Sequence, residues 1–270
     1  MRSPLVALTV AGTDSGGAAG VAADLATFAA LGAHGTCAVT AVTAQDTTGV
    51  HAVVHLSADH VRAQVDAVLD DLPVAVAKAG MLGSAEIAGV VADLPPGLPL
   101  VVDPVLRTTS GSVLADDALV AAYRDHILPR CTVVTPNLAE ARRLAGAGSE
   151  EPLEHVARAL QALGPAVVLT GGDPESDWCR DFVVDDRGRA HVLEHPGVPT
   201  TNDHGTGCTF SAALAVHLAR GEALPAATRS AQAFVAAALR RSAGWRLGRG
   251  RGPVAHTFAH PTTNPSPQEA

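Results

Sequence analysis

Aromatic residues are scarce in this sequence. They make up 3% of the 270 residues, whereas hydrophobic residues make up 47%. A core of normal density must therefore be built from closely packed Ala, Val and Leu rather than from rings. The four cysteines lie far apart, without a CxxC pair or metal-ligand spacing. This pattern argues against a disulfide framework and a structural zinc site, and it favours a reducing compartment.

Basic runs and long apolar runs are also missing. The net charge is −8 and Lys and Arg are dispersed, so we expect no nucleic-acid surface. No stretch reaches the roughly 18 uninterrupted apolar residues that a membrane span needs. The short apolar run at residues 5–10 lacks the cleavage site of a secretory signal. We therefore expect a cytoplasmic protein without membrane contact.

Short apolar runs alternate with amphipathic stretches along the chain. Strands are predicted at residues 5–10, 35–42, 74–77, 100–105, 131–135 and 166–170, with a hairpin at 180–184 and 191–194. Helices are predicted at residues 19–31, 57–70, 84–93, 114–127, 154–163 and 226–241, and another ends near residue 219. Such alternation is typical of an α/β domain whose mostly parallel sheet carries helices on both faces. We expect one domain over residues 1–260 and a disordered tail over 261–270.

The stretch from Asn202 to Leu214 changes from a polar, glycine-punctuated turn into an apolar run, which predicts a helix N-terminus. Free N–H groups and the helix dipole at such a terminus can bind an anion. Gly205 and Gly207 would let the backbone approach that anion closely. The alternative is an ordinary loop followed by a capped helix.

Cys208 falls in the first turn of this helix. There the dipole would lower the pKa of the thiol and make a thiolate available. The alternative is that Cys208 is a small buried apolar residue.

Polar residues follow three other predicted strands, where parallel sheets bind ligands. Gln45, in a predicted loop over residues 44–50, could read a flat heterocycle or merely satisfy its own loop. Asp103 ends a buried strand and could be a site carboxylate or a surface charge. Asn137 and Glu140 have the spacing of a capping box, which is a structural role by itself.

Seven short blocks occur in an order that resembles one family. They are residues 11–14, 23–25, 43–45, 78–82, 102–105, 135–140 and, above all, His204-Gly205-Thr206-Gly207-Cys208-Thr209. Together they resemble the ribokinase-like superfamily, and within it the hydroxymethylpyrimidine/phosphomethylpyrimidine kinases of thiamine biosynthesis. The resemblance covers nearly the whole chain and implies a ribokinase-like fold.

The resemblance implies transfer of the γ-phosphoryl group of ATP to 4-amino-5-hydroxymethyl-2-methylpyrimidine and then to its monophosphate. The N–H groups of Gly205, Thr206, Gly207 and Cys208 would cradle the transferred charge without reorienting. Cys208 would be the base for the substrate hydroxyl, where many superfamily members have an Asp.

The family's other ligand contacts carry over to matching positions. Substrate contacts would come from Gly12, Asp24, Gln45 and Met81. Nucleotide contacts would come from Asn137, Thr170 and Gly172. Glu140 and, by extension, Asp103 would hold Mg²⁺ through water. Relatives also imply a homodimer.

Two departures leave alternatives open. Ala18, Ala22 and Ala26 stand where the family usually has Gly, Gln and a basic residue. Thr170-Gly171-Gly172-Asp173 replaces Lys-Gly-Gly-His, and the lost cation predicts weaker nucleotide binding or compensation by metal. The chain could instead be a pyridoxal or pyridoxine kinase of vitamin B6 salvage, or a ligand-binding protein without turnover.

Overall fold

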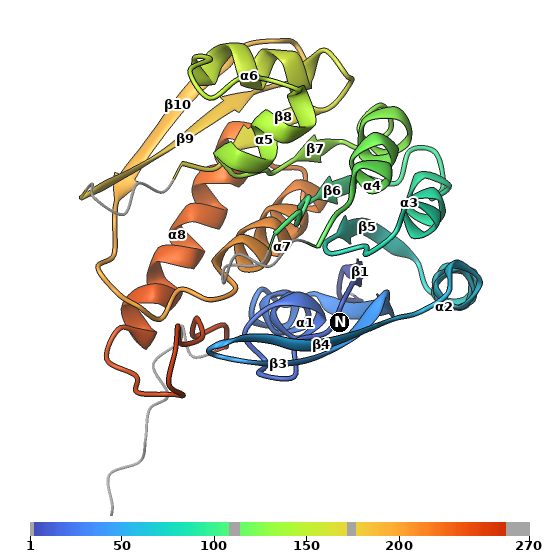
Figure 1. Cartoon of the computed structure of the whole chain (residues 1–270), viewed down its shortest axis with the longest axis horizontal. Coiled ribbons are helices and arrows are strands. Elements are labelled where there is room, and N and C mark those ends of the chain that lie inside the picture. The colour runs from blue at the N-terminus through green and yellow to red at the C-terminus, as the bar shows by residue number, and fades with distance from the viewer. Residues whose placement is uncertain (1–2, 108–113, 172–176, 258–270) are drawn as a thin grey trace, which may run out of the picture.

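An eight-stranded sheet forms the centre of the computed structural model, which describes residues 3–107, 114–171 and 177–257 (Figure 1). Its strands, in spatial order, are β10 (Ala190–Pro196), β9 (Trp178–Val184), β8 (Ala166–Leu169), β7 (Val133–Val134), β6 (Leu100–Val102), β5 (Val74–Ala79), β1 (Val6–Ala11) and β2 (His34–Val39). The strands from β8 to β2 pair in parallel, while β9 and β10 are antiparallel. The sheet is therefore mostly parallel, as predicted.

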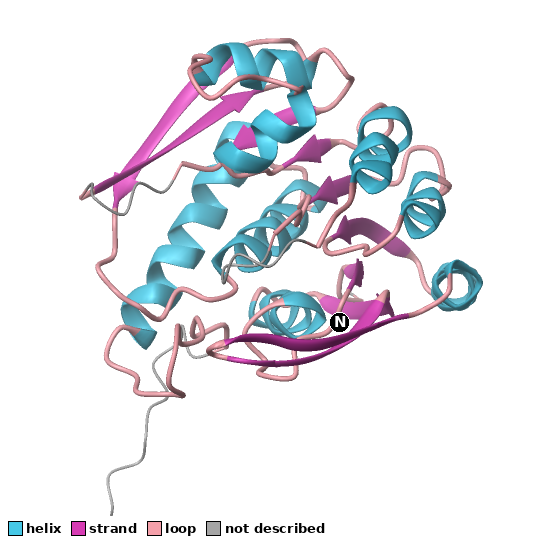
Figure 2. Ribbon diagram, viewed as in Figure 1, coloured by secondary structure: helices cyan, strands magenta, loops and turns pink. Residues whose placement is uncertain are grey.

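Helices cover both faces of this sheet (Figure 2). One face carries α2 (Ala58–Asp71), α3 (Ala85–Ala92), α4 (Asp117–Ala122), α5 (Leu138–Ala145) and α6 (Leu153–Gln161). The other carries α1 (Gly20–Ala30), α7 (Thr206–Ala219) and α8 (Leu224–Ser242). Successive strand residues, such as Val101 and Val102, belong to opposite cores, as the period of two requires. Both faces of each central strand are buried, which explains the continuous apolar runs.

The sequence prediction is wrong at residues 35–50. Instead of one strand and a loop, the chain leaves the sheet at Thr40 and forms an antiparallel hairpin of β3 (Ala41–Asp46) and β4 (Gly49–His55). Along β3, buried and exposed residues alternate from Ala41 to Ala44, which is the pattern of a strand with one solvated face. Gln45 therefore lies on a strand, at a register shift of the hairpin.

Helix α7 begins where the backbone passes through the left-handed region at Gly205, with φ of 88°. A Cβ at this position would lie 1.8 Å from the carbonyl oxygen of Ala18, so only glycine fits. Every residue from Thr209 to Val216 is buried, which makes α7 a central helix rather than an amphipathic surface helix.

The other predicted elements are found with small shifts of their ends. The largest shifts are of three residues: the helix expected at residues 114–127 begins at Asp117 and ends in one π-helical turn, η1 (Tyr123–Ile127), and the strand expected at 100–105 ends at Val102. The capping box of Asn137 and Glu140 at α5 is confirmed. The site residue Gly172 and the expected tail at 261–270 lie outside the described residues.

A segment near the end of the described chain returns to the hairpin. The N–H groups of Arg249 and Gly250 donate to Thr47 Oγ1, and the N–H of Arg251 donates to the Thr47 carbonyl. Pro253 then pairs with His204, just before α7. Residues 249–253, called the strap below, thus join the β3–β4 turn to the entrance of α7.

Candidate active site

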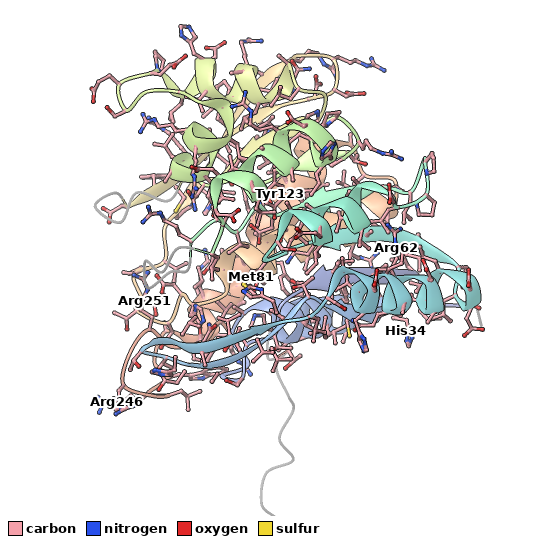
Figure 3. All side chains as sticks on the ribbon, turned by 45° about the vertical axis from the view of Figure 1, so that its right-hand side comes forward. His34, Arg62, Met81, Tyr123, Arg246 and Arg251 are labelled. Atoms are coloured by element: carbon pink, nitrogen blue, oxygen red, sulfur yellow. The ribbon has the colours of Figure 1, made fainter. Side chains whose placement is uncertain are left out.

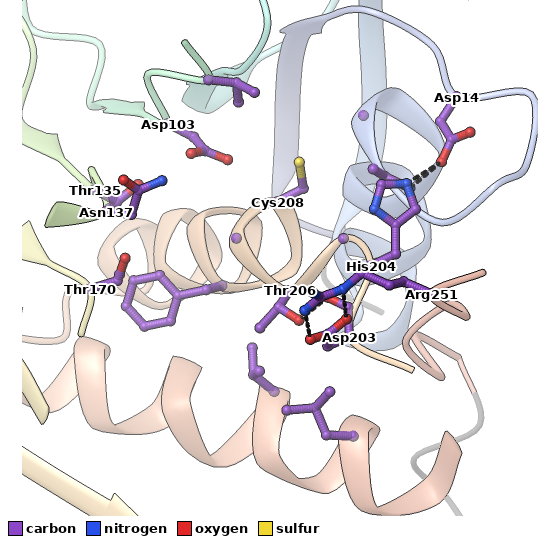
Figure 4. Close-up of a pocket in the computed structure, with 18 of the residues that line it drawn as sticks. Asp14, Asp103, Thr135, Asn137, Thr170, Asp203, His204, Thr206, Cys208 and Arg251 are labelled. Atoms are coloured by element: carbon purple, nitrogen blue, oxygen red, sulfur yellow. Dashed lines mark hydrogen bonds and ion pairs between the residues drawn. The ribbon is translucent and has the colours of Figure 1, made fainter. Parts of the chain in front are cut away.

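A pocket of about 820 Å³ lies between the carboxyl ends of the parallel strands, the β3–β4 hairpin and the N-terminus of α7 (Figure 4). Met81 lies near the centre of the view in Figure 3 and Arg251 near its left edge, and both line this pocket. Most of the residues predicted from the sequence also line it. They are Gly12, Gln45, Met81, Asp103, Asn137, Glu140, Thr170, Gly205, Thr206, Gly207 and Cys208.

Asp24 is the exception. Its side chain is fully buried on α1, does not line the pocket, and accepts hydrogen bonds from Thr9 Oγ1 (2.6 Å) and from Lys78 Nζ (2.9 and 3.0 Å). In this structure Asp24 holds Lys78 and does not face a ligand. The sequence gave no sign of this ion pair, because the residue pattern of a helix does not distinguish an Asp that contacts a ligand from an Asp that pairs with a Lys.

Lys78 is a pocket residue that the sequence analysis did not assign. Its side chain is fully buried on β5, and Nζ lies 4.0 Å from Asp103 Oδ2. Although burial opposes the charge, the pKa of Lys78 is raised above its ordinary value by Asp24, Cys208 and Asp103. Lys78 therefore keeps a positive charge beneath the pocket. A lysine inside the apolar run Val74–Ala79 was the available signal.

Two buried carboxylates stand close together on the wall beside α5. Burial raises the pKa of Asp103, and the charge of Asp24 adds to this rise. Burial also raises the pKa of Glu140 to about 8, and the charge of Asp103 adds to that rise. Glu140 Oε1 and Oε2 accept the N–H groups of Leu106 (3.2 Å) and Asn137 (3.0 Å). This wall therefore has an excess of negative charge when both groups are ionised.

Cys208 faces the pocket between Asp103 on one side and the Asp14–His204 pair on the other (Figure 4). The prediction of a lowered thiol pKa is wrong: burial raises the pKa of Cys208 to about 12. Asp103 and Asp24 add to this rise, while Lys78 and the Gly20 N–H oppose it. The helix dipole is outweighed by desolvation and by two carboxylates. Asp103 Oδ2 accepts its side-chain hydrogen bond from Ser211 Oγ (3.3 Å).

Three further polar side chains meet at the opposite wall. His204 Nε2 lies 2.8 Å from Gln45 Nε2 and 3.3 Å from Asp14 Oδ2. Asp14 accepts the N–H groups of Gly16, Ala18 and Ala19 at 2.8 to 3.0 Å. Asp14 and His204 belong to sequence blocks that pointed to the family, but the sequence gave them no individual role.

No group of three or more His, Cys, Asp or Glu side chains that could hold a metal ion occurs among residues 3–107, 114–171 and 177–257. Within the same residues, no helix is long and apolar enough to cross a membrane.

A mostly parallel sheet with helices on both faces, and a pocket where a glycine-started helix meets the strand ends, define a ribokinase-like kinase. The comparisons with known proteins narrow this class. The model of the phosphomethylpyrimidine kinase family matches residues 14–255, and the chain belongs to that family.

Similar proteins include both kinds of vitamin kinase. The hydroxymethylpyrimidine/phosphomethylpyrimidine kinase of Synechococcus elongatus is 45% identical over 258 residues, covering 94% of this chain and 97% of that protein. A solved phosphomethylpyrimidine kinase from Clostridium difficile has a TM-score of 0.74 and 31% identity, over 86% of this chain and 97% of that one. The pyridoxal kinase of Staphylococcus aureus, solved with AMP-PCP and pyridoxal, has a TM-score of 0.85 and 33% identity, covering 95% and 94%.

Proposed function

We propose that this kinase transfers the γ-phosphoryl group of ATP to the hydroxymethyl oxygen of 4-amino-5-hydroxymethyl-2-methylpyrimidine, and then to the phosphate of the monophosphate formed, in thiamine biosynthesis. The observation that carries the proposal is the position of Cys208: its thiol lies in the first turn of α7, faces the pocket and lies between Asp103 and the Asp14–His204 pair.

The N-terminus of α7 would stabilise the transferred phosphoryl group. Gly205, Thr206 and Gly207 line the pocket at this terminus, where N–H groups lack intrahelical acceptors. The Thr206 side chain donates to the Asp203 carbonyl, which fixes this turn before a ligand arrives. Donors fixed in this way stabilise developing charge without reorganising during the reaction.

The proton of the substrate hydroxyl would leave through Cys208 and Asp103. As the hydroxyl oxygen bonds to phosphorus and the bond from phosphorus to the leaving ADP oxygen breaks, Sγ takes the hydroxyl proton and passes its own to Asp103. A free thiolate is not needed in this route. Because burial raises the pKa of Asp103, its carboxylate is a better proton acceptor than an ordinary aspartate.

The substrate ring would lie against the hairpin wall. Gln45 would read polar atoms of the pyrimidine, and Met81 with Gly12 would form an apolar surface beneath the ring. The Met81 methyl group reaches the space above Gly12, since a Cβ there would lie 2.2 Å from Met81 Cε. This pair of Gln45 and Met81 favours the pyrimidine over pyridoxal.

The nucleotide would lie toward Asn137 and Thr170, with Gly172 beyond the described residues. The residues here suit Mg²⁺ held through water: a bound cation would favour the ionised forms of Asp103 and Glu140, and Glu140 already accepts an N–H on each oxygen. When bound, Mg²⁺ would neutralise phosphate charge, which partly offsets the cation absent at Thr170. We further propose a cytoplasmic homodimer.

The test is ATP consumption by the purified protein with Mg²⁺ and, in parallel, the hydroxymethylpyrimidine, its monophosphate and pyridoxal, with Cys208→Ala as the control. Turnover of both pyrimidines would support the proposal. Turnover of pyridoxal alone would assign the chain to vitamin B6 salvage, as its resemblance to the Staphylococcus aureus kinase allows. Nucleotide binding without turnover would indicate a non-catalytic protein.

A further inference from the structure

One nitrogen atom in the pocket has two polar neighbours with opposite requirements. His204 Nε2 lies 3.3 Å from a carboxylate oxygen of Asp14 and 2.8 Å from the side-chain amide of Gln45. The carboxylate can only accept a hydrogen, so it requires a hydrogen on Nε2. An amide NH₂ group can only donate, so it requires a lone pair on the same atom.

Asp14 is the stronger of these two neighbours. Its side chain is 2% exposed and accepts three backbone N–H groups besides His204. Burial alone would raise its pKa, but the hydrogen bonds from His204, Gly16 and Ala19 lower it below the ordinary value, so the group is an anion. Hydrogen bonds to an ionised acceptor are about twice as strong as neutral ones. The hydrogen therefore belongs on Nε2.

The backbone of Gln45 is held by Ser15. Its backbone N–H donates to Ser15 Oγ, and Ser15 Oγ donates to its carbonyl, both at 2.7 Å. Ser15 follows Asp14 in the turn after β1, so one turn holds Gln45 directly and His204 through a carboxylate. A turn of the amide by 180° exchanges its oxygen and nitrogen with almost no change of shape. The contact with His204 can therefore decide which way the amide of Gln45 faces.

We propose that His204, held by Asp14, is a specificity-determining positioning residue: its single Nε2–H is shared between Asp14 Oδ2 and Gln45 Oε1, which turns the NH₂ group of Gln45 toward the ligand. The inference rests on the proposed function, because it takes Gln45 as a substrate contact. It adds the class of ligand atom that this wall reads, namely an unprotonated ring nitrogen that accepts a hydrogen bond.

The consequence is a pocket that penalises ligands without that acceptor. When a ligand has a C–H in place of the ring nitrogen, the fixed NH₂ group has no acceptor. The resulting loss of binding free energy is larger than the contribution of the hydrogen bond itself. If the amide could turn freely, it would find another partner and the penalty would shrink. Discrimination, rather than affinity alone, is therefore the property that His204 controls.

The test measures calorimetric binding, without nucleotide, of 4-amino-5-hydroxymethyl-2-methylpyrimidine and of two analogues in which one ring nitrogen or the other is replaced by CH. We expect the original chain to bind one analogue about tenfold more weakly than the parent compound. In His204→Phe that ratio should fall below about threefold, and Gln45→Ala should behave in the same way. The double variant His204→Phe/Gln45→Ala should show the same ratio as Gln45→Ala alone, because His204 acts through Gln45.

His217→Phe is the matched control. Its side chain is also 13% exposed and also pairs with a carboxylate, Glu222 at 2.6 Å, but it lies in the last turn of α7 and does not line the pocket. It should keep the tenfold ratio. If His204→Phe does not fold, His204→Gln replaces it, since a free amide at 204 can also face Gln45 either way.

Two results would overturn the inference: equal binding of the parent and both analogues by the original chain, or full discrimination by His204→Phe. Neither affects the proposed function, which depends on turnover of the parent compound. Turnover of pyridoxal alone, with no binding of the pyrimidine, would instead overturn the proposed function and this inference with it.

Discussion

Replacement of Lys78 by Met tests whether the charges beneath the pocket act as one unit. Lys78 and Asp24 are both fully buried, and their side chains are joined by two hydrogen bonds of 2.9 and 3.0 Å. Removing one partner of such a pair leaves a buried charge without compensation. The expected cost to the free energy of unfolding is about 3–5 kcal/mol.

The double variant Asp24→Asn/Lys78→Met should be more stable than Lys78→Met alone. An Asn can still accept the hydrogen bond from Thr9, and no unpaired charge remains at residue 24. Asp103 loses a cation 4.0 Å away in both variants, so we expect the double variant to stay about 1–2 kcal/mol below the original chain.

The pH dependence gives a second, independent readout. Burial already raises the pKa of Asp24, and Lys78 opposes that rise. Without Lys78 the folded state binds the Asp24 proton more tightly than the unfolded state, so stability falls as pH rises above the unfolded pKa. The defect of Lys78→Met should therefore be larger at pH 8 than at pH 5. This difference should be much smaller in the double variant.

Urea unfolding of the three proteins at both pH values measures these effects. A loss of less than about 1 kcal/mol at pH 8 in Lys78→Met, or a double variant no more stable than the single one, would refute the reasoning. Either result would mean that water or a rearranged side chain replaces the ammonium group.

Three other predictions concern the pocket. Cys208→Ala should lower kcat by about 10²-fold or more with an unchanged unfolding midpoint; a kcat within twofold would contradict the proton route. Gly205→Ala should lose about 1–3 kcal/mol of unfolding free energy or more, because its Cβ meets the Ala18 carbonyl. Gly207→Ala, with its nearest neighbour at 3.9 Å, is the control, and an equal loss there would contradict this explanation. The pKa of Glu140 is about 8 in the folded state, above its unfolded value. The free energy of unfolding should therefore fall by up to about 1.4 kcal/mol per pH unit as the pH rises from roughly 4.5 to 8. Urea unfolding of Glu140→Gln should show a weaker fall over the same range.

Local chemistry allowed much of the fold to be predicted. The strand runs, the helix start at α7 and the capping box of Asn137 and Glu140 depend on neighbours within a few residues, and the structure contains each of them. The hairpin at residues 41–55 was missed because its alternation begins immediately after β2, so the two strands resembled one strand and a loop.

The site was harder to predict because its energetics depend on distant residues. The pocket residues could be predicted to lie close together because they follow strand ends. The pKa of the Cys208 thiol could not be predicted in this way, since it depends on Asp103 and Asp24, each more than 100 positions away in the sequence. Asp24 itself was expected at the substrate, and only the structure shows that its oxygens are used by Lys78 and Thr9.

The strap also determines when the pocket can form during synthesis. Hydrogen bonds from Arg249 and Gly250 to Thr47 join residues about 200 positions apart, and Pro253 pairs with the residue that contacts Gln45. The ribosome synthesises the hairpin early and the strap late. The hairpin therefore lacks its contacts with the strap until most of the chain has been made. The contacts between the strap and the hairpin are therefore among the last of a newly made molecule to form, and a nascent chain that stops before residue 249 lacks them.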